Sequence, residues 1–315
     1  MPAGEFELIQ RYLRGLGASR DDVLLGVGDD CALVAPPPGL ELALAADTIV
    51  EGVHFPKGLR AADVGHRVLA VNLSDLAAMG ADPAWALLTL TLPAPDEAWL
   101  EGFAAGFGAL ALRHGTALVG GDTTSGPLTA TVAIAGFVAP ATALRRSGAR
   151  AGDTVWVSGL PGEAAAGLAV LQGRIGGPAG ARERLVARFL RPEPRVGLGR
   201  ALRGAATACI DVSDGLAADL GKLCAASGVG AALEGARLPV SADLADCAGD
   251  GPALRFLLAG GDDYELVFTL PPGTEPPDFA GAPLARIGVV VAAPGVTLDG
   301  APLPRDVAHG FDHFA

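Results

Sequence analysis

The sequence AADVGHRVLAVNLSDLAAMGADPAWALLTLTL, residues 61–92, places a helix pattern directly before a strand pattern. Apolar residues recur at helical spacing through Ala61–Met79, and Gly80 is typical of the position just after a helix. Trp85–Leu92 ends by alternating Thr with Leu, which is typical of a strand. A helix that passes at once into a strand predicts layers in which helices cover a sheet.

The same mixture of helix and strand continues on both sides of this stretch. We expect a strand within Leu40–Val53, a helix over Asp96–His114, and a short strand at Ala117–Val119 that runs into a glycine-rich loop. The other expected elements are helices at 5–16, 162–172 and 181–190 and strands at 129–138 and 264–270. The predicted fold class is therefore α/β, built as α+β layers.

A change of pattern divides the chain in two. Residues 145–153, RRSGARAGD, are charged, contain glycine and show no apolar periodicity, and a strand pattern restarts after them. The length of 315 residues also suits two domains of roughly 150 residues each. We expect an N-terminal domain at 1–148 and a C-terminal α/β domain at 149–315.

Charge and composition narrow the class of protein. The formal net charge of −12 argues against a protein that binds nucleic acid through its phosphates. The first residues include two Glu and no apolar segment of the kind found in a signal peptide. The uncharged stretch Leu128–Leu144 contains Thr, Gly and Pro, which fits a strand and its loop rather than a membrane span. No two of the four cysteines have metal-ligand or redox spacing, which favours reduced cysteines in a cytoplasmic protein. The charge and the absence of a membrane-span pattern predict that it has no nucleic-acid or membrane partner.

The sequence lacks the common motifs for nucleotide binding and hydrolysis. It contains no G-x-x-x-x-G-K-[ST] phosphate loop, dinucleotide-binding G-x-G-x-x-G, G-x-S-x-G nucleophile elbow or H-E-x-x-H zinc motif. Any phosphate chemistry must then proceed without a phosphate-loop lysine.

Two aspartates lie where no local structure explains them. Asp47 interrupts the apolar strand LALAADTIV, and Asp75 lies within the predicted helix, with Asn72 one turn before it on the same face. Charged side chains are rarely buried in apolar sequence unless they are paired or hold a metal.

Other polar residues have a structural reading beside the functional one. Asp29–Asp30 follow a Gly-Val-Gly turn, Asp122 suits an Asx turn, and Asp214 suits the N-cap of a helix that begins with GLAADLGKLC. Taken alone, His54 is more often structural than catalytic, and Arg145–Arg146 would be a solvated linker.

Convergence of several of these acids would require cations. Two carboxylates about 5 Å apart repel by roughly 3 kcal/mol at an effective dielectric constant near 20. The aspartates that we expect to converge are Asp30, Asp47, Asp75 and Asp122. Oxygen ligands without neighbouring Lys or Arg favour Mg²⁺, and Mg²⁺ on carboxylates usually has a phosphate as a further ligand.

The order of these motifs resembles the thiamine-monophosphate kinase family across essentially the whole chain. The similar segments are GEFELI, GVGDDCALV, DTIVEGVHF, AVNLSDLAAMGADPAW, GGDTTSGP, RSGARAGD, RPEPR, IDVSDGL, GGDDYEL and the terminal DHFA. AVNLSDLAAMGA and GGDTT are shared more widely with the aminoimidazole-ribonucleotide-synthetase-like ATP-binding superfamily, whereas the GEF start, DTIVEGVHF and GGDDYEL indicate the kinase branch.

This resemblance implies a fold and an activity. The N-terminal domain would form a β-barrel with its copy in a homodimer, and ATP would lie between the N- and C-terminal domains. The activity would be Mg²⁺-dependent transfer of the γ-phosphoryl group of ATP to thiamine monophosphate, which gives thiamine diphosphate as the last step of its biosynthesis. Because the acceptor is an ionised phosphate oxygen, direct in-line transfer needs no catalytic residue that acts as a covalent intermediate or general base.

The resemblance also assigns roles by position. Several Mg²⁺ ions would be held by Asp30, Asp47, Asp75, Asp122, Asp211 and Asp214. ATP would be contacted by Gly121, Asp122, Arg146 and Ser213. Thiamine monophosphate would be contacted by His54, Asp262 and Phe311.

The sequence departs from the family pattern at three places. Ala45–Ala46 stand where hydroxyl residues are common, Asp262 stands where Glu is common, and Phe311 stands where Tyr or Trp is common. Two other readings stay open at this point. One is a sister ATP-dependent enzyme of the same superfamily, and the other is a non-catalytic module that binds nucleotide or metal.

Overall fold

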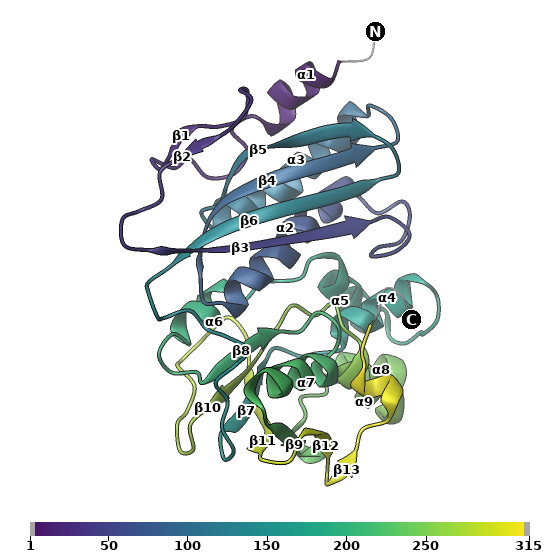
Figure 1. Cartoon of the computed structure of the whole chain (residues 1–315). Helices are drawn as coiled ribbons and strands as arrows, with labels where there is room; N and C mark the ends of the chain where they lie inside the picture. The colour runs from purple at the N-terminus through teal and green to yellow at the C-terminus, as the bar shows by residue number, and fades with distance from the viewer. Residues whose placement is uncertain (1–3, 312–315) are drawn as a thin grey trace. The chain divides into compact units, whose positions relative to one another are not determined.

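The structure, a computed structural model, describes residues 4–311 (Figure 1). The chain divides into two compact units, Met1–Leu76 with Ala81–Ala141 and Ala77–Gly80 with Thr142–Ala315. The break after Ala141 lies close to the boundary expected between 148 and 149, which itself remains a prediction. Each unit combines helices with a sheet, so the mixed α/β class is confirmed. The terminal DHFA segment, 312–315, lies outside the described residues.

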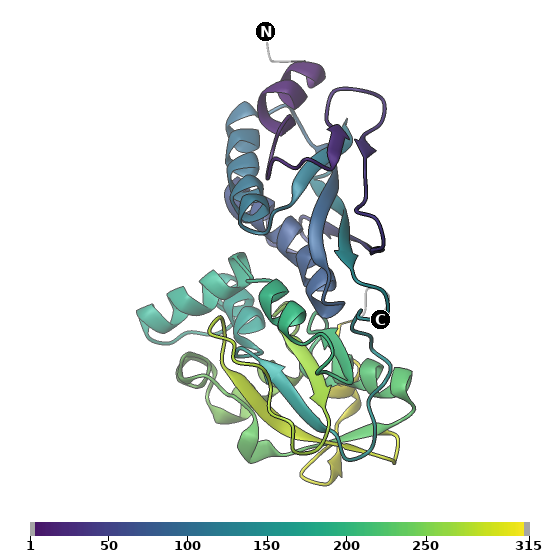
Figure 2. The ribbon, with the colours of Figure 1, turned by 90° about the vertical axis from the view of Figure 1, so that its left-hand side faces the viewer.

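The first unit is a four-stranded sheet with two long helices on one face. In spatial order its strands are β3 (Glu41–Val50), β6 (Thr129–Val138), β4 (Asp82–Leu92) and β5 (Ala117–Ser125). Only the β4–β5 pair is parallel. Helices α2 (Ala61–Ala78) and α3 (Glu97–Arg113) lie on the same side of this sheet (Figure 2).

Two glycines allow α2 and α3 to pack closely. A Cβ atom on Gly106 would lie 1.9 Å from the carbonyl oxygen of Ala62, and one on Gly65 would lie 2.1 Å from that of Phe103. Any side chain at either position would push the helices apart. The start of α3 is the one expected, because the carboxylate of Asp96 accepts a hydrogen bond of 3.0 Å from the Trp99 N–H and caps the helix.

The glycine-rich loop expected after Val119 is instead part of strand β5. The strand stays paired with β4 as far as Ser125, across a register shift between Ala86 and Leu87. Gly121 permits this pairing, since its φ is +146° and a Cβ atom there would lie 1.8 Å from the carbonyl oxygen of Leu88. The loop prediction was wrong because paired glycines indicate a loop locally, whereas the partner strand is distant in the sequence.

The N-terminal segment is less regular than expected. Helix α1 (Glu5–Leu8) continues into a π-helical turn, η1 (Ile9–Leu13), so the helix ends before the predicted 16. The GVGDDCALV run then lies between and within two short antiparallel strands, β1 (Val23–Leu25) and β2 (Leu33–Val34).

Large apolar side chains are exposed on the sheet of the first unit. Leu42, Leu44 and Leu87 have exposed fractions of 47%, 73% and 44%. Leu44 and Leu87 line a hollow of about 1230 Å³, which the N-terminal segment also borders through Phe6 and Asp30. The sheet of the first unit therefore keeps several large apolar side chains in contact with solvent in this single chain.

The second unit contains a seven-stranded, mostly antiparallel sheet. In spatial order its strands are β13 (Ala301–Pro302), β12 (Gly295–Leu298), β9 (Gly230–Leu233), β11 (Leu284–Val291), β7 (Thr154–Ser158), β10 (Leu266–Leu270) and β8 (Ala208–Asp211). Only β9 and β12 pair in parallel. The central strands β7 and β10 are buried along their whole length, which places the core of this unit at the middle of the sheet.

Helices surround the sheet of the second unit. They are α4 (Glu163–Leu171), α5 (Ala179–Leu190), α6 (Val196–Ala201), α7 (Leu216–Ser227), α8 (Ala242–Ala248), α9 (Asp250–Ala259) and α10 (Arg305–Ala308), with a 3₁₀ turn η2 (Gly235–Arg237). The apolar side of α7 shares a buried cluster with residues of the sheet, while α4, α5, α8 and α9 meet in a smaller cluster. Across residues 4–311, no helix is both long and apolar enough to cross a bilayer.

Candidate functional site

In the first unit, the strand acid and the helix acid lie at one junction. The backbone N–H of Asp47 in β3 donates a hydrogen bond of 2.9 Å to Oδ1 of Asn72 in α2. Asn72 is completely buried, and its amide group donates in turn to the Val68 carbonyl at 2.9 Å. Asp75 is about one turn further along the same face of α2, so the fold brings the Asp47 backbone to the helix face that carries Asp75.

Asp122 lies at the other side of this sheet. It stands in β5 opposite Thr89 of β4, and the same row continues through Thr131 to Thr48 of β3. Because β3 and β5 are the two edge strands, the backbones of Asp47 and Asp122 are separated by three strand spacings, about 14 Å. Within one chain, these two aspartates therefore do not converge.

Asp30 lies in the exposed turn before β2. Its N–H donates 2.8 Å to the Asp29 carboxylate, so the pair does form the local turn that its sequence suggested. Asp30 also borders the hollow over the sheet, and so does Gly121. The hollow thus brings one predicted metal ligand near one predicted ATP contact.

No group of three or more Asp, Glu, His or Cys side chains in residues 4–311 is arranged to hold a metal ion. The expected four-aspartate cluster of Asp30, Asp47, Asp75 and Asp122 is therefore not assembled by the described chain alone. The donors are nonetheless carboxylate and amide oxygens, the ligand chemistry that Mg²⁺ prefers. The oxygen ligands of the predicted site therefore fit Mg²⁺.

His54 has a local structural contact in the turn after β3. The Nδ1 atom of its imidazole accepts a hydrogen bond of 3.0 Å from the Val50 N–H, and the backbone N–H of His54 donates one of 2.9 Å to the Val50 carbonyl. An imidazole whose Nδ1 is an acceptor carries its proton on Nε2 when it is neutral.

In the second unit, three separate segments meet before α7. Strand β8 ends at the buried Asp211, and Ser213 and Asp214 follow it directly. The Ser213 carbonyl accepts 2.8 Å from the Asp262 N–H, and the Asp214 carbonyl accepts 3.2 Å from the Phe311 N–H. The fold therefore places Ser213, Asp214, Asp262 and Phe311 side by side, although they are distant in sequence.

Asp214 does not cap α7, contrary to the structural reading of its sequence. Gly215 occupies the N-cap position, and the carboxylate of Asp214 is paired with the ammonium of Lys222. Asp219, within the first turn of α7, instead holds the loop before the helix, because its Oδ2 accepts hydrogen bonds of 3.0 and 2.9 Å from the N–H groups of Ser213 and Asp214. Burial raises the pKa of the Asp219 carboxyl, and its contact with Lys222 at 2.8 Å opposes that shift.

Arg146 is placed at the opposite end of α7 from Ser213. Its carbonyl accepts 3.0 Å from the hydroxyl of Ser227, the last residue of the helix. A helix of 12 residues is about 18 Å long. The backbone of Arg146 is thus about one helix length from Ser213, and the side chain of Arg146 is exposed.

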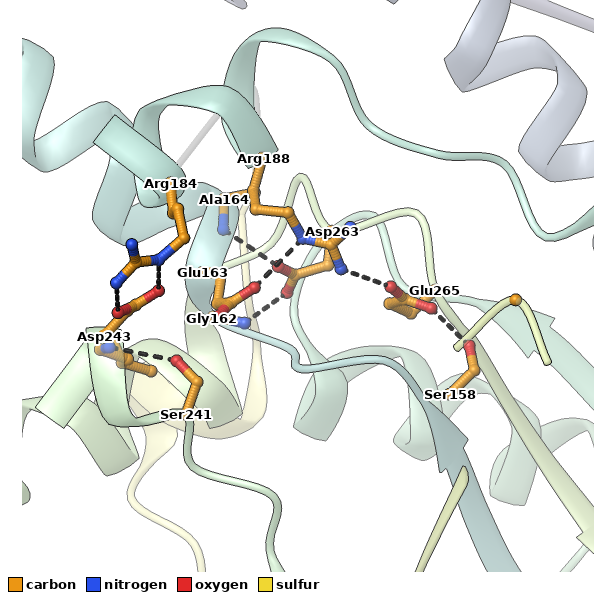
Figure 3. Close-up of polar contacts among 12 residues, drawn as sticks. Ser158, Gly162, Glu163, Ala164, Arg184, Arg188, Ser241, Asp243, Asp263 and Glu265 are labelled. Atoms are coloured by element: carbon orange, nitrogen blue, oxygen red, sulfur yellow. Dashed lines mark hydrogen bonds and ion pairs between the residues drawn. The ribbon is translucent and has the colours of Figure 1, made fainter. Parts of the chain in front are cut away.

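The loop between α9 and β10 carries Asp262 in an unusual backbone conformation. Asp262 and Tyr264 have φ of +62° and +53°, and the Tyr264 hydroxyl donates 3.1 Å to Asp262 Oδ1. Asp262 is partly exposed, whereas the residues after it are buried. The carboxylate of Asp263 accepts from the N–H groups of Gly162 and Ala164 at 2.8 and 3.3 Å, which caps α4 (Figure 3).

The sequence did not reveal the pairing of several charged side chains around these loops, some buried and some partly exposed. They are Asp219, Lys222, Asp263, Glu265, Arg188 and Arg195. The Asp219–Lys222 pair has the i, i+3 spacing of a helical ion pair, which is a usable signal. The contact between Arg195 and Glu265 has no local signal, because the RPEPR and GGDDYEL segments that contain them are far apart in the chain.

Comparisons with known proteins agree with the motif order. Residues 28–138 match the family model described as AIR synthase related protein, N-terminal domain. A thiamine-monophosphate kinase from Salmonella typhimurium is 48% identical over 324 aligned residues, which cover 100% of this chain and 99% of that protein. The structure of a thiamine-monophosphate kinase from Stenotrophomonas maltophilia K279a superposes with a TM-score of 0.85 at 46% identity, covering 96% of this chain and 99% of that one.

A second solved structure adds ligands to the comparison. It is described as AaThiL complexed with AMPPCP and TMP, and it matches at 32% identity with a TM-score of 0.81, covering 89% of each chain. Identity of nearly half over the full length, together with the same fold, is sufficient to assign the family. The chain belongs to the thiamine-monophosphate kinase family.

Proposed function

We propose that this protein transfers the γ-phosphoryl group of ATP to thiamine monophosphate and so forms thiamine diphosphate. The observation that carries this proposal is the 48% identity with a thiamine-monophosphate kinase over the whole length of both chains. A related structure whose description names an ATP analogue and TMP supports the same pair of substrates. The enzyme would work in the cytoplasm, where the four free cysteines would stay reduced.

Phosphoryl transfer requires positioned reactants and neutralised charge more than covalent chemistry by the protein. Mg²⁺, when bound, would supply that neutralisation in place of a phosphate-loop lysine. The carboxylates that would hold Mg²⁺ are Asp30, Asp47, Asp75, Asp122, Asp211 and Asp214. The Asp47–Asn72–Asp75 junction supports this for the first unit, and the Asp211–Asp214 loop supports it for the second.

The remaining contacts follow from the chemistry of each group. Gly121 and Asp122 of β5 would contact ATP, and Arg146 and Ser213 would donate to its phosphate oxygens. His54 would donate from Nε2 to the acceptor phosphate. Asp262 would contact that phosphate through a cation, because two anions need one between them, and Phe311 would pack on the thiamine rings.

The acceptor oxygen is already ionised at neutral pH, so its nucleophile does not have to be deprotonated. Direct in-line attack on the γ-phosphorus therefore needs no general base and no phospho-enzyme intermediate. The protein's own task is to bind, to orient both phosphates and to exclude water.

The enzyme would act as a homodimer, with the sheets of the two N-terminal domains closing into a β-barrel. The exposed Leu42, Leu44 and Leu87 support this arrangement, because a second copy would cover them. A partner would also bring a second set of Asp47 and Asp122 to the assembly. Light scattering at micromolar concentration tests the dimer, and a monomeric mass would exclude it.

Phosphorus NMR tests the reaction itself. Purified protein with ATP, Mg²⁺ and thiamine monophosphate should produce thiamine diphosphate and ADP together, and a chelator should stop both. If folded protein binds ATP and yields neither product, the substrates of sister enzymes in the superfamily come next. Nucleotide binding without ADP from any acceptor would indicate a non-catalytic module.

A further inference from the structure

We infer that Glu265 and its two arginines form a positioning network that sets the backbone of the Asp262 loop and thereby the affinity for the acceptor. The inference rests on the proposed role of Asp262 in binding thiamine monophosphate. Glu265 itself is buried, so its role would be exerted through the loop that ends at it.

The carboxylate of Glu265 is saturated by hydrogen bonds. Arg195 donates to both of its oxygens, from Nε at 2.6 Å and from a terminal nitrogen at 2.5 Å. Arg188 donates at 3.0 Å and the Ser158 hydroxyl at 2.5 Å. Figure 3 shows the contacts of Arg188 and Ser158 with Glu265 beside the Asp263 carboxylate, and Arg188 also donates to Glu163 of α4 at 3.1 Å.

The surrounding backbone is shaped to admit this carboxylate. A Cβ atom on Gly159 would lie 2.0 Å from Glu265 Oε1, so only glycine leaves room for it. The Ser158 hydroxyl accepts a hydrogen bond of 2.9 Å from the Leu266 N–H and donates to the Glu265 carboxylate. It therefore holds both the last residue of the loop, Glu265, and the first residue of β10, Leu266. Buried ion pairs are often no more stabilising than apolar packing of the same volume. A saturated network beside a ligand loop is therefore better explained by the geometry that it defines.

That geometry is a strained segment with anchored inner side chains. Asp263 and Glu265 point inward, to the start of α4 and to the arginines, whereas Asp262 is partly exposed and accepts from the Tyr264 hydroxyl. The chain adopts positive φ at Asp262, just before the first anchor, and at Tyr264, between the two anchors, a conformation that few non-glycine residues tolerate. Releasing the anchor at Glu265 would let the segment relax and would move Asp262.

Matched variants of two arginines on α5 test this inference. Arg188→Gln removes one of the arginine donors to Glu265. Arg184, one turn before Arg188 on α5, forms an exposed ion pair with Asp243 of α8, and Arg184→Gln breaks that pair (Figure 3). We expect Arg188→Gln to raise the KM for thiamine monophosphate about threefold to tenfold with the KM for ATP unchanged within twofold. Glu265→Gln should raise it by about tenfold or more, and Arg184→Gln should change neither constant.

A purely structural role predicts something else. In that case the variants would have a lower melting temperature and a smaller fraction of active enzyme, but both KM values would be unchanged or raised equally. Unchanged or equally raised KM values would overturn the inference. If Glu265→Gln does not fold, Arg188→Gln decides, because its side chain is one-third exposed.

Amide exchange in the absence of substrates separates this inference from the proposed reaction. The Asp262 and Tyr264 N–H groups, bonded to the Ser213 and Val212 carbonyls at 2.8 Å, should exchange at least tenfold faster in Arg188→Gln than in Arg184→Gln. Equal exchange in the two variants would refute the positioning role, whatever the wild-type enzyme phosphorylates. A wild type that forms no thiamine diphosphate would refute only the proposed function.

Discussion

Replacement of Asp219 by Ala would remove the group that holds the Ser213–Asp214 loop at the start of α7. The carboxylate accepts two backbone hydrogen bonds, of 3.0 and 2.9 Å, and is 1% exposed. Hydrogen bonds to a charged acceptor contribute about 1.5–3 kcal/mol each, and the donors are half-buried, so we take the lower end and expect a loss of about 3 kcal/mol. The ion pair with Lys222 adds little, because the ammonium is 42% exposed and retains Asp214.

Urea denaturation followed by circular dichroism measures this loss. The midpoint should fall while the slope with denaturant stays constant, which shows that stability changed and not the extent of unfolding. Asp243→Ala is the matched control, since Asp243 accepts two bonds from Arg184 at the surface and its loss should leave the midpoint almost unchanged. A loss below about 1 kcal/mol for Asp219→Ala would refute the reasoning that these two bonds hold the loop.

Three further predictions concern single side chains. Asp75→Asn should fold with the melting temperature of the wild type and lose about a hundredfold or more in turnover by the NMR assay; normal turnover would exclude Asp75 as a metal ligand. Burial raises the pKa of Asp263 well above its usual value, against the opposing bonds from α4, so the stability it contributes is complete below the unfolded pKa near 3.9 and is lost as pH rises through the raised folded value. Denaturation at pH 4.5 and 7.5 should therefore show wild type losing stability relative to Asp263→Asn, and a constant difference would contradict it. Burial raises the pKa of Cys224 to about 11, so iodoacetamide should label exposed Cys31 first and Cys224 only on unfolding, because its thiolate is about a hundredfold scarcer than at the ordinary pKa of 9.0; equal labelling by mass spectrometry would show that the core opens.

Elements set by local pattern were predictable, and those set by distant pairing were not. Helix α3 follows its N-cap Asp96, begins at Glu97 and ends at Arg113, almost as its sequence indicates. Strand β5 was read as ending at Val119, because only its pairing with β4 makes Gly120–Ser125 extended. The π-helical turn over Ile9–Leu13 likewise has no signal in apolar spacing.

The candidate site follows the same division. Asn72 was expected on the same face of its helix as Asp75, and the structure adds that Asn72 receives the Asp47 N–H. The N-cap prediction for Asp214 was wrong because the Asp214 carboxylate pairs with Lys222, two turns into α7, while the Asp214 N–H donates to Asp219. The assembly of aspartates into one metal site could not be derived from their spacing, since Asp47 and Asp122 stand on opposite edges of a sheet.

The loops of the second unit are joined by main-chain atoms rather than by side chains. The Asp262 N–H bonds to the Ser213 carbonyl, and the Phe311 N–H bonds to the Asp214 carbonyl. A mutation at Asp262 or Phe311 therefore changes the chemistry offered to a ligand while the scaffold between the segments persists. Substitutions at these two positions should therefore report on ligand contact alone, because the main-chain bonds that join the segments need neither side chain.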